Sequence, residues 1–487
     1  MHPTTPGPIW LQPFKWSRPT TTRESDTSKV DRVLSTQRHH SSGCAEQLCL
    51  LSVFLDDFPK SSRLRCERPV FERIFPPGKL EAIRDGDFDG ADGLAVWLRD
   101  VDQDNKPRDS NGLMTNMQLH HYTSLRRINE KDMVDALRRR IYIPNPSPVT
   151  LGILAFRSSN EQNQSMRSMI YKHLEADTDI GLTSFGLEGS REFSLEFHVR
   201  SQIWRSGDPF RPDKRLTSSG EPLRQAKELS FFSTSRDGKN TTECRDFLYE
   251  SHISICVTGW NTAEWTAICL VDSYYDDDTD EDEPLMLSHY LDEGDLDSPP
   301  CDALSLGELV SDEKVPKDPR EYFLLVCALQ LKRISEEWRL IEFQLKTNVR
   351  PYLDRPPLPL KRQRTTLGNV NEDCENVEAS EMWCKETSGL ITTLTSSLDT
   401  IVRSVDRFVE RHFHRIDDRE DPELSYQLRS SVTEIMGLRN QLDKIQDGLK
   451  ALQSEVKTFQ EKASIFELHL AVDSNRAIVL QHWNVTI

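Results

Sequence analysis

A hydrophobic ladder with alternating three- and four-residue steps runs from residue 435 to residue 470. A seven-residue repeat kept over five heptads predicts one helix about 50 Å long, because a helix rises about 1.5 Å per residue. The apolar seam of such a helix has to pack along a partner. The rungs of the ladder are all apolar: Ile435, Leu438, Leu442, Ile445, Leu449, Leu452, Val456, Phe459, Ala463, Phe466 and Leu470.

The sequence leaves two partners open for this seam. One lies within the chain, where residues 324–349 and 390–412 each place apolar side chains on one helix face. The other is a second copy of the chain, which would make a homo-oligomer through the C-terminal helix. Both fit, because five heptads offer more apolar surface than one shorter helix covers. The residues predicted at the oligomer interface are Leu438, Leu442, Ile445, Leu449, Leu452, Val456 and Phe459.

The rest of the chain divides into segments of different character. Residues 1–65 combine Pro, Ser, Thr and charge with one short apolar patch, which predicts a mostly disordered tail. Residues 66–320 alternate short apolar strands with amphipathic helices, which predicts an α/β domain with a mixed sheet. The predicted fold class is α+β: this domain, then long antiparallel helices and a terminal stalk or coiled-coil helix. The later segments are a long helix at 321–350, a Pro-rich and basic, polar linker at 351–385 and a helical hairpin at 386–487.

Individual strands are visible within the α/β domain. Residues 140–144 form one candidate, and residues 193–199 alternate apolar and polar side chains as a half-buried strand requires. Residues 252–258 and 265–271 are two further apolar runs separated by a short loop. This spacing predicts a β-hairpin.

Two helix starts share one local signal. Asp318-Pro319 and Asp421-Pro422 each place an N-cap aspartate before a proline at the first helical position. The second pair follows a short hinge, which predicts that the last two helices form an antiparallel hairpin. Pro351 predicts the end of the helix that starts after Asp318.

Negative charge is concentrated in one part of the chain. The net charge is −18, and between Arg245 and Lys314 there are 19 Asp and Glu but no Lys or Arg. The remainder is nearly neutral, which argues against a nucleic-acid partner. The stretch 272–315 therefore predicts a solvated acidic loop, because like charges at this density repel one another. Asp276, Asp277 and Asp278 are its candidate ligands for weakly bound Mg²⁺, since hard cations prefer oxygen ligands, although the spacing of a dedicated calcium loop is absent.

No motif for catalysis or for a required cofactor stands out. The chain has no Gly-x-Ser-x-Gly elbow, no phosphate-binding Gly-x-x-x-x-Gly-Lys loop and no His-Glu-x-x-His pair. Its ten cysteines include no Cys-x-x-Cys pair, and Cys256 and Cys269 lie in apolar runs that predict buried free thiols. We therefore predict no catalytic and no cofactor-binding residues.

Three stretches together resemble a known family. They are Arg-Glu-Phe-Ser-Leu-Glu-Phe-His-Val at 191–199, Trp-Thr-Ala-Ile-Cys-Leu-Val-Asp at 265–272, and 322–338, which begins Tyr-Phe-Leu-Leu-Val and ends Glu-Glu-Trp. With the long terminal helix they resemble the cytosolic part of fungal CorA-like magnesium transport proteins. The resemblance implies an N-terminal α/β domain, long helices, and a stalk that leads into two membrane spans of a pentamer. The family's Gly-Met-Asn tripeptide is absent, and no window approaches about 18 consecutive apolar residues.

These observations lead to one expectation and two alternatives. The chain is expected to be a non-catalytic cytosolic domain, regulatory or cation-linked, that does not transport ions as written. It is expected in the cytoplasm, and at a membrane only if a longer product encodes the two spans. One alternative is a soluble coiled-coil scaffold without an ion role. An enzyme of unrecognised type ranks third.

Overall fold

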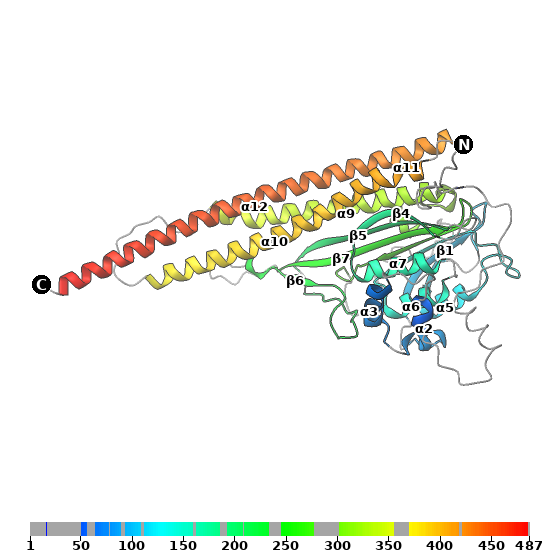
Figure 1. Cartoon of the computed structure of the whole chain (residues 1–487), viewed down its shortest axis with the longest axis horizontal. Helices are drawn as coiled ribbons and strands as arrows, with labels where there is room; N and C mark the ends of the chain where they lie inside the picture. Colours follow the sequence, from blue (N-terminus) through cyan, green and yellow to red (C-terminus); the bar gives the residue numbers. More distant parts are fainter. Residues whose placement is uncertain are drawn as a thin grey trace, which may run out of the picture.

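A computed structural model describes most of the chain in three layers (Figure 1): small helices, one sheet and a layer of long helices. The described residues are 16, 50–55, 64–76, 78–88, 93–108, 112–158, 162–185, 192–207, 209–232, 245–276, 301–354, 370–417 and 421–485, without the side chains of 64–66, 185, 370–380 and 466–485. The predicted α+β class is confirmed. The elements are α2 Leu50–Leu55, α3 Leu64–Ile74, α4 Lys79–Arg84, β1 Leu94–Val101, β2 Gly112–Thr115, α5 Asn116–Ser124, β3 Arg138–Pro144, α6 Pro148–Arg157, α7 Asn163–Leu174, β4 Asp179–Phe185, β5 Glu192–Ser206, β6 Ala226–Glu228, β7 Asp246–Gly259, β8 Trp265–Val271, α9 Pro319–Leu353, α10 Val370–Arg411, α11 Phe413–Ile416 and α12 Pro422–Val485, with short 3₁₀ turns η2 Ser230–Phe232, η3 Ala303–Ser305 and η4 Asp312–Lys314.

The sheet is mixed, as the sequence predicts. Its strand order is β2-β1-β3-β8-β7-β5-β4, and β6 pairs with β7 outside this path. β3 and β8 run parallel, whereas the other pairs are antiparallel. The predicted hairpin is confirmed as β7 and β8, with Gly259 opposite Trp265 at its closed end.

Two hydrophobic cores lie on opposite faces of the sheet. Because successive strand residues point to opposite faces, Cys269 and Val271 of β8 enter the core under the long helices, while Ile268 and Leu270 enter the core under the small helices. The second core also contains the five buried apolar residues of α2. The prediction of a disordered tail over 1–65 is therefore wrong for Leu50–Leu55, because this apolar patch packs in a core; most of the other residues of that tail lie outside the described part.

β5 is buried on both faces, so the prediction of a half-buried strand is wrong. Phe193, Leu195 and Phe197 enter the core under the long helices, as expected from their apolar character. The alternating polar residues Glu196 and His198 face α7 instead of water and are 2% and 0% exposed. Burial is tolerated here because these side chains find hydrogen-bond partners, which lowers its cost.

Gly259 closes the β7–β8 hairpin through a close backbone approach. A Cβ atom at this position would meet the backbone oxygen of Glu264 and would lie 2.9 Å from Cα of Trp265. Neither atom can move without distorting the hairpin. We therefore expect Gly259→Ala to lower the free energy of unfolding by about 1–3 kcal/mol, measured by urea denaturation. Gly437→Ala, at a helix position where an added Cβ meets nothing, is the control; equal losses for both variants would contradict this explanation.

The ladder packs within the chain. α12 lies along both α9 and α10 (Figure 1), and the seven residues predicted for an oligomer interface are no more than 7% exposed. The intramolecular alternative therefore accounts for this seam. Association of copies through α12 stays a prediction, and in this conformation it would need another face of the helix. Phe466 and Leu470 lie outside the described side chains.

A close helix approach explains the glycine inside the ladder. A Cβ atom at Gly448 would collide with the carboxylate of Glu342, which pairs with Lys346 on the facing side of α9. The missing side chain lets this ion pair lie against α12. Glycine lowers helix propensity by about 1 kcal/mol relative to alanine, but at this position it leaves room for the Glu342 carboxylate.

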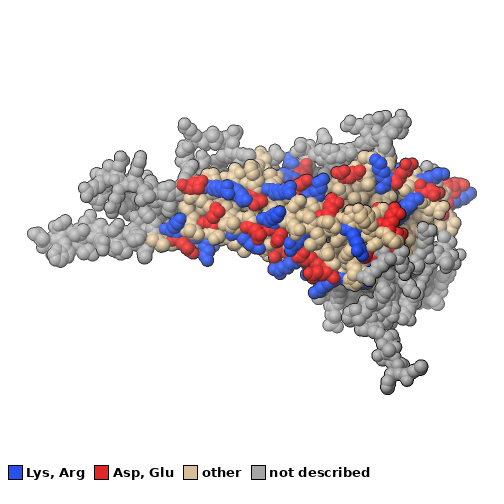
Figure 2. Space-filling view, turned by 90° about the horizontal axis from the view of Figure 1, so that it is seen from above, with Lys and Arg blue, Asp and Glu red and all other residues tan. Residues whose placement is uncertain are grey.

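The helix ends differ from the prediction in two places. α10 begins at Val370, inside the stretch 351–385 assigned to a linker, since no Pro or Gly interrupts it before Gly389 and Trp383 stacks on Tyr352 at 3.8 Å. α9 passes Pro351 and ends at Leu353. Figure 2 shows acidic and basic side chains interspersed over the described part of the helical face, without a patch of one sign.

Candidate functional site

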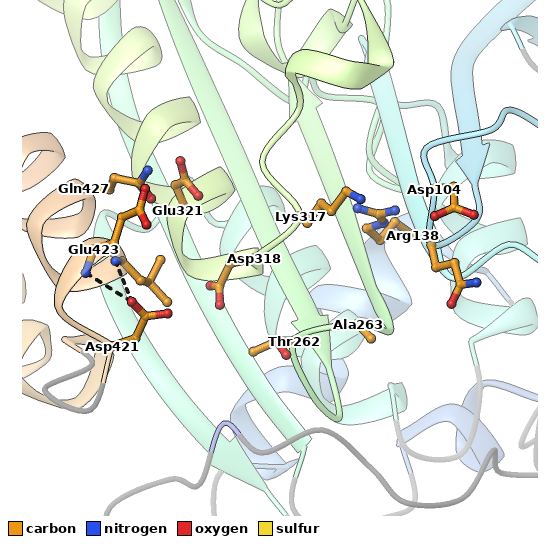
Figure 3. Close-up of a pocket in the computed structure, with 12 residues that line it drawn as sticks. Asp104, Arg138, Thr262, Ala263, Lys317, Asp318, Glu321, Asp421, Glu423 and Gln427 are labelled. Atoms are coloured by element: carbon orange, nitrogen blue, oxygen red, sulfur yellow. Dashed lines mark hydrogen bonds between the residues drawn. The ribbon is translucent and has the colours of Figure 1, made fainter.

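A polar groove of about 650 Å³ lies where the sheet meets the long helices. Figure 3 shows Glu321, Glu423 and Gln427 together on one side of the groove, and Lys317, Arg138 and Asp104 on the other. The groove is built only by the tertiary fold, since its walls come from residues more than 300 positions apart in sequence. Its lining is Gln103, Asp104, Arg138, Thr262, Ala263, Lys317, Asp318, Glu321, Asp421, Glu423, Leu424 and Gln427.

Two helix starts shape the acidic side. Asp318 caps α9 by accepting the backbone N–H of Arg320 at 2.8 Å. Asp421 accepts the backbone N–H groups of Glu423 and Leu424, both at 3.1 Å (Figure 3). These caps satisfy N–H groups that have no partner within a helix. The sequence predicted both caps, and they place Glu321 and Glu423 in the first turns of α9 and α12.

Acidic and basic side chains lie on opposite sides of the groove, with Glu321 and Glu423 on one side and Lys317 and Arg138 on the other. Burial and the neighbouring carboxylate of Asp318 raise the pKa of Glu321 above its ordinary value. On the other side, burial and the charge of Arg140 lower the pKa of Arg138, which is 3% exposed. The groove therefore presents an acidic wall with Glu321 and Glu423 and an opposite wall with the cations Lys317 and Arg138 and the carboxylate of Asp104.

The donor set limits which metal sites are compatible with the fold. Within the described ranges, no group of three or more His, Cys, Asp and Glu side chains has the geometry to hold a metal ion. Mg²⁺ commonly keeps several waters and uses one or two carboxylates, and this mode matches the acidic wall.

The predicted metal ligand Asp276 forms an ion pair with Arg205. Its carboxylate accepts hydrogen bonds from Arg205 at 2.8 and 3.2 Å, and Arg205 also pairs with Glu337 of α9 at 3.0 and 3.2 Å. Arg205 therefore joins the end of β5 both to Asp276, after β8, and to Glu337 of α9. Asp277 and Asp278 lie outside the described residues.

The ends of the acidic stretch are buried, so its description as a solvated loop over 272–315 is wrong there. Asp302 is 1% exposed, pairs with Arg140 at 3.1 Å and accepts the Tyr322 hydroxyl at 2.9 Å. Asp312 pairs with Arg99 and with Arg140. Basic residues from the sheet supply the charge that the local sequence lacks, which the run of acids could not reveal.

Asp272 is the centre of a second buried ion-pair network. Its carboxylate is fully buried and accepts hydrogen bonds from Arg215 at 2.7 Å and Arg224 at 2.5 Å. It also accepts the backbone N–H of His252 at 2.8 Å. Burial alone would raise the pKa of Asp272, but the two guanidinium groups hold it well below its ordinary value.

A buried polar chain continues from this network across the sheet. The Ser254 hydroxyl lies 3.2 Å from Nδ1 of His173 and 2.9 Å from Nδ1 of His198. Nε2 of His198 lies 3.3 Å from Glu196, and Lys172 donates to Glu196 at 2.6 Å. Such a chain fixes α7 against β5 and β7 through directed hydrogen bonds.

The histidines of this layer are held neutral. Burial lowers the pKa of His173 to about 4 and also lowers that of His198. Burial, together with the neighbouring His173 ring and the Arg224 guanidinium, lowers the pKa of His252 well below its ordinary value. Both ring nitrogens of His252 lack a hydrogen-bond partner among the described residues. The sequence did not predict this buried polar layer. The signal that could have pointed to it is the polar residues Glu196 and His198, which alternate with apolar ones in β5.

Residues 191–199, 265–272 and 322–338, the stretches on which the predicted family resemblance rests, pack against one another where the sheet meets α9. The rings of Trp265 in β8 and Tyr322 in α9 are 5.1 Å apart, and the indole N–H of Trp265 donates to the carbonyl of Lys317 at 3.0 Å. Phe193 of β5 and Trp338 of α9 are fully buried in the same core. Residues from these stretches therefore form part of the packing that joins the sheet to α9.

No protein-family model and no curated protein matches the chain. Among solved structures, the cytoplasmic domain of ZntB from Vibrio parahaemolyticus is similar at 10% sequence identity and a TM-score of 0.34, over 77% of this chain and 99% of that chain. The full-length CmaX protein is similar at 11% identity and a TM-score of 0.37, over 81% of this chain and 83% of that chain. These likenesses are remote and assign no function.

The resemblance of the sequence to fungal CorA-like proteins stays a prediction. Over the part of the chain that the structure describes, no helix is both long and apolar enough to span a membrane.

Proposed function

We propose that this chain is a non-catalytic regulatory protein of the CorA-like type and that its groove binds a hydrated divalent cation such as Mg²⁺. The observation that carries the proposal is the position of Glu321, which lies in the first turn of α9 and lines the groove (Figure 3). A cation nearby would favour the charged form of this carboxylate. Glu423, from a different helix, lies on the same side of the groove (Figure 3).

The groove suits a weakly held, hydrated ion. Its volume of about 650 Å³ leaves room for the water shell that Mg²⁺ gives up reluctantly. Lys317 and Arg138 on the opposite wall, together with the positive ends of α9 and α12, oppose a cation and reduce its affinity. We therefore expect a dissociation constant on the order of 1 mM.

A specific observation favours the alternative, a scaffold without an ion role. Asp318 and Asp421 serve as N-caps, and Glu321 and Glu423 occupy the first helical turns. Carboxylates at these positions interact favourably with the helix dipole without any ligand. All four acids thus have a structural explanation.

Isothermal titration of Mg²⁺ separates the two functions. Wild-type protein is expected to release or absorb heat with millimolar affinity, and the double variant Glu321→Gln/Glu423→Gln is expected to lose this signal. The matched control is Asp276→Asn/Asp277→Asn/Asp278→Asn, which is expected to titrate like the wild type because Asp276 is held by Arg205.

Three results would contradict the proposal. Identical traces for wild type and the groove variant would exclude the groove as the site. If only the Asp276 triple variant lost the heat of Mg²⁺ binding, the site would lie in the acidic stretch and not in the groove. No heat in any protein would favour the scaffold.

A further inference from the structure

Trp16 packs against the hinge between the two longest helices. Its indole N–H donates a hydrogen bond to the carbonyl oxygen of Arg415 in α11 at 3.1 Å. Its ring centroid lies 5.0 Å from that of Phe193 in β5 and 4.6 Å from the guanidinium carbon of Arg320 in α9. One side chain from the start of the chain thus contacts a strand, a long helix and the hinge.

We propose that Phe193, Arg320 and the carbonyl of Arg415 form a binding seat for the indole of Trp16, and that this side chain latches the start of α9 to the α10–α12 hinge. The occupant is Trp16 of the same chain. This inference does not depend on cation binding in the groove.

The parts of the seat also make contacts that do not involve Trp16. Phe193 belongs to the core under the long helices. The guanidinium of Arg320 donates to both carboxylate oxygens of Asp318, at 2.9 and 2.8 Å. It also donates to the carbonyl of Ile416 at 3.3 Å. A guanidinium held flat in this way is well placed to stack against an aromatic ring.

The end of α11 supplies the acceptor that an indole needs. The last carbonyl groups of a helix have no partner within that helix. At α11, Arg320 donates to the carbonyl of Ile416, and the indole donates to that of Arg415. Phenylalanine would keep the stacking but would lack this donor, so the seat selects tryptophan over phenylalanine.

The position of α11, which Trp16 contacts, also affects where α12 starts. Asp417, directly after α11, accepts hydrogen bonds from Ser425 at 2.6 Å and from Arg429 at 2.7 Å, and both donors belong to α12. A latch on α11 therefore holds the position from which α12 starts. Release of Trp16 from the seat would loosen this turn without unfolding either long helix.

Hydrogen–deuterium exchange of the full-length chain tests the latch. In Trp16→Ala, the amides of 411–425 and of the first turn of α9 are expected to exchange about tenfold faster, with those of β7 and β8 unchanged. Trp16→Phe is expected to give a smaller increase. Trp10→Ala, which changes another tryptophan of the same segment, is the control and is expected to match the wild type.

A peptide that spans residues 8–24, added to Trp16→Ala, is expected to restore protection at the hinge. Unchanged exchange in Trp16→Ala, an equal increase in Trp10→Ala, or no restoration by the peptide would each overturn the proposal. Light scattering decides whether the latch is within one chain: a lower mass for Trp16→Ala than for the wild type would show that the seat holds Trp16 of a second copy.

Discussion

Replacing Asp272 by Asn is expected to lower the free energy of unfolding by about 3–5 kcal/mol. The carboxylate is fully buried and compensates the charges of Arg215 and Arg224, which are themselves buried or nearly so. Asparagine keeps the size and one acceptor oxygen but carries no negative charge, so positive charge would remain in the interior without its main counter-charge. Urea unfolding at neutral pH, followed by circular dichroism, measures the loss.

The control for this variant is Asp443→Asn. Asp443 is an exposed partner of Arg439 within α12, and its side chain is 42% exposed. Exposed pairs at this spacing contribute only about 0.3–0.5 kcal/mol. If Asp272→Asn were no more destabilising than Asp443→Asn, the buried network around Asp272 would not have the role described above.

Stability is expected to fall as the pH drops from about 6.5 to about 4. Unfolded histidines take up a proton near pH 6.5, whereas burial lowers the pKa of His173 to about 4 in the folded chain. Between these values the unfolded state binds more protons, so acid favours unfolding and the full stability is present only above about pH 6.5. His173 alone accounts for a loss on the order of 3 kcal/mol, and His198 and His252, whose pKa values are also lowered, add to it.

The carboxylates of the same layer extend the loss to lower pH. The pKa values of Asp272 and Glu196 are held below their ordinary values of 3.8 and 4.5 by the cations and histidine beside them, which outweigh the effect of burial. Their contribution is complete above those ordinary values and is lost as the pH falls below them. Urea midpoints measured from neutral pH to about pH 4.5 report the loss of stability that comes from the histidines, because the carboxylates contribute mainly below this range.

His252→Phe provides a direct test of the buried histidines. Both nitrogens of His252 lack a hydrogen-bond partner in the described structure, so an apolar ring of similar shape is expected to be neutral or stabilising at neutral pH and to reduce the loss in acid. His121→Phe, at an exposed histidine, is expected to leave the acid loss unchanged. An acid loss in His252→Phe equal to that of the wild type would contradict the assignment.

The sequence was a good guide wherever a residue's role follows from its immediate neighbours. The ladder, the β7–β8 hairpin and the N-caps Asp318 and Asp421 are local patterns, and the structure has all of them. The ladder did not reveal whether its partner was internal. That choice depends on α9 and α10 both lying along α12, which is a long-range property.

Residues whose role depends on distant partners were not predictable in the same way. Glu196 and His198 look solvent-facing in an alternating strand, and only the position of α7, with Lys172 and His173, makes them buried. Asp276 looked like a metal ligand because its sequence neighbours are acidic, whereas Arg205 binds it from β5. Glu321 and Glu423 joined no motif, because the groove that unites them forms only when α9 and α12 meet the sheet.

The most direct test of the cation proposal is an anomalous difference map from crystals of the full chain soaked in Mn²⁺, which prefers the same oxygen ligands as Mg²⁺. We expect a manganese peak in the groove, beside the carboxylates of Glu321 and Glu423. A peak at Asp276 instead, or an empty groove in crystals that bind manganese elsewhere, would contradict it.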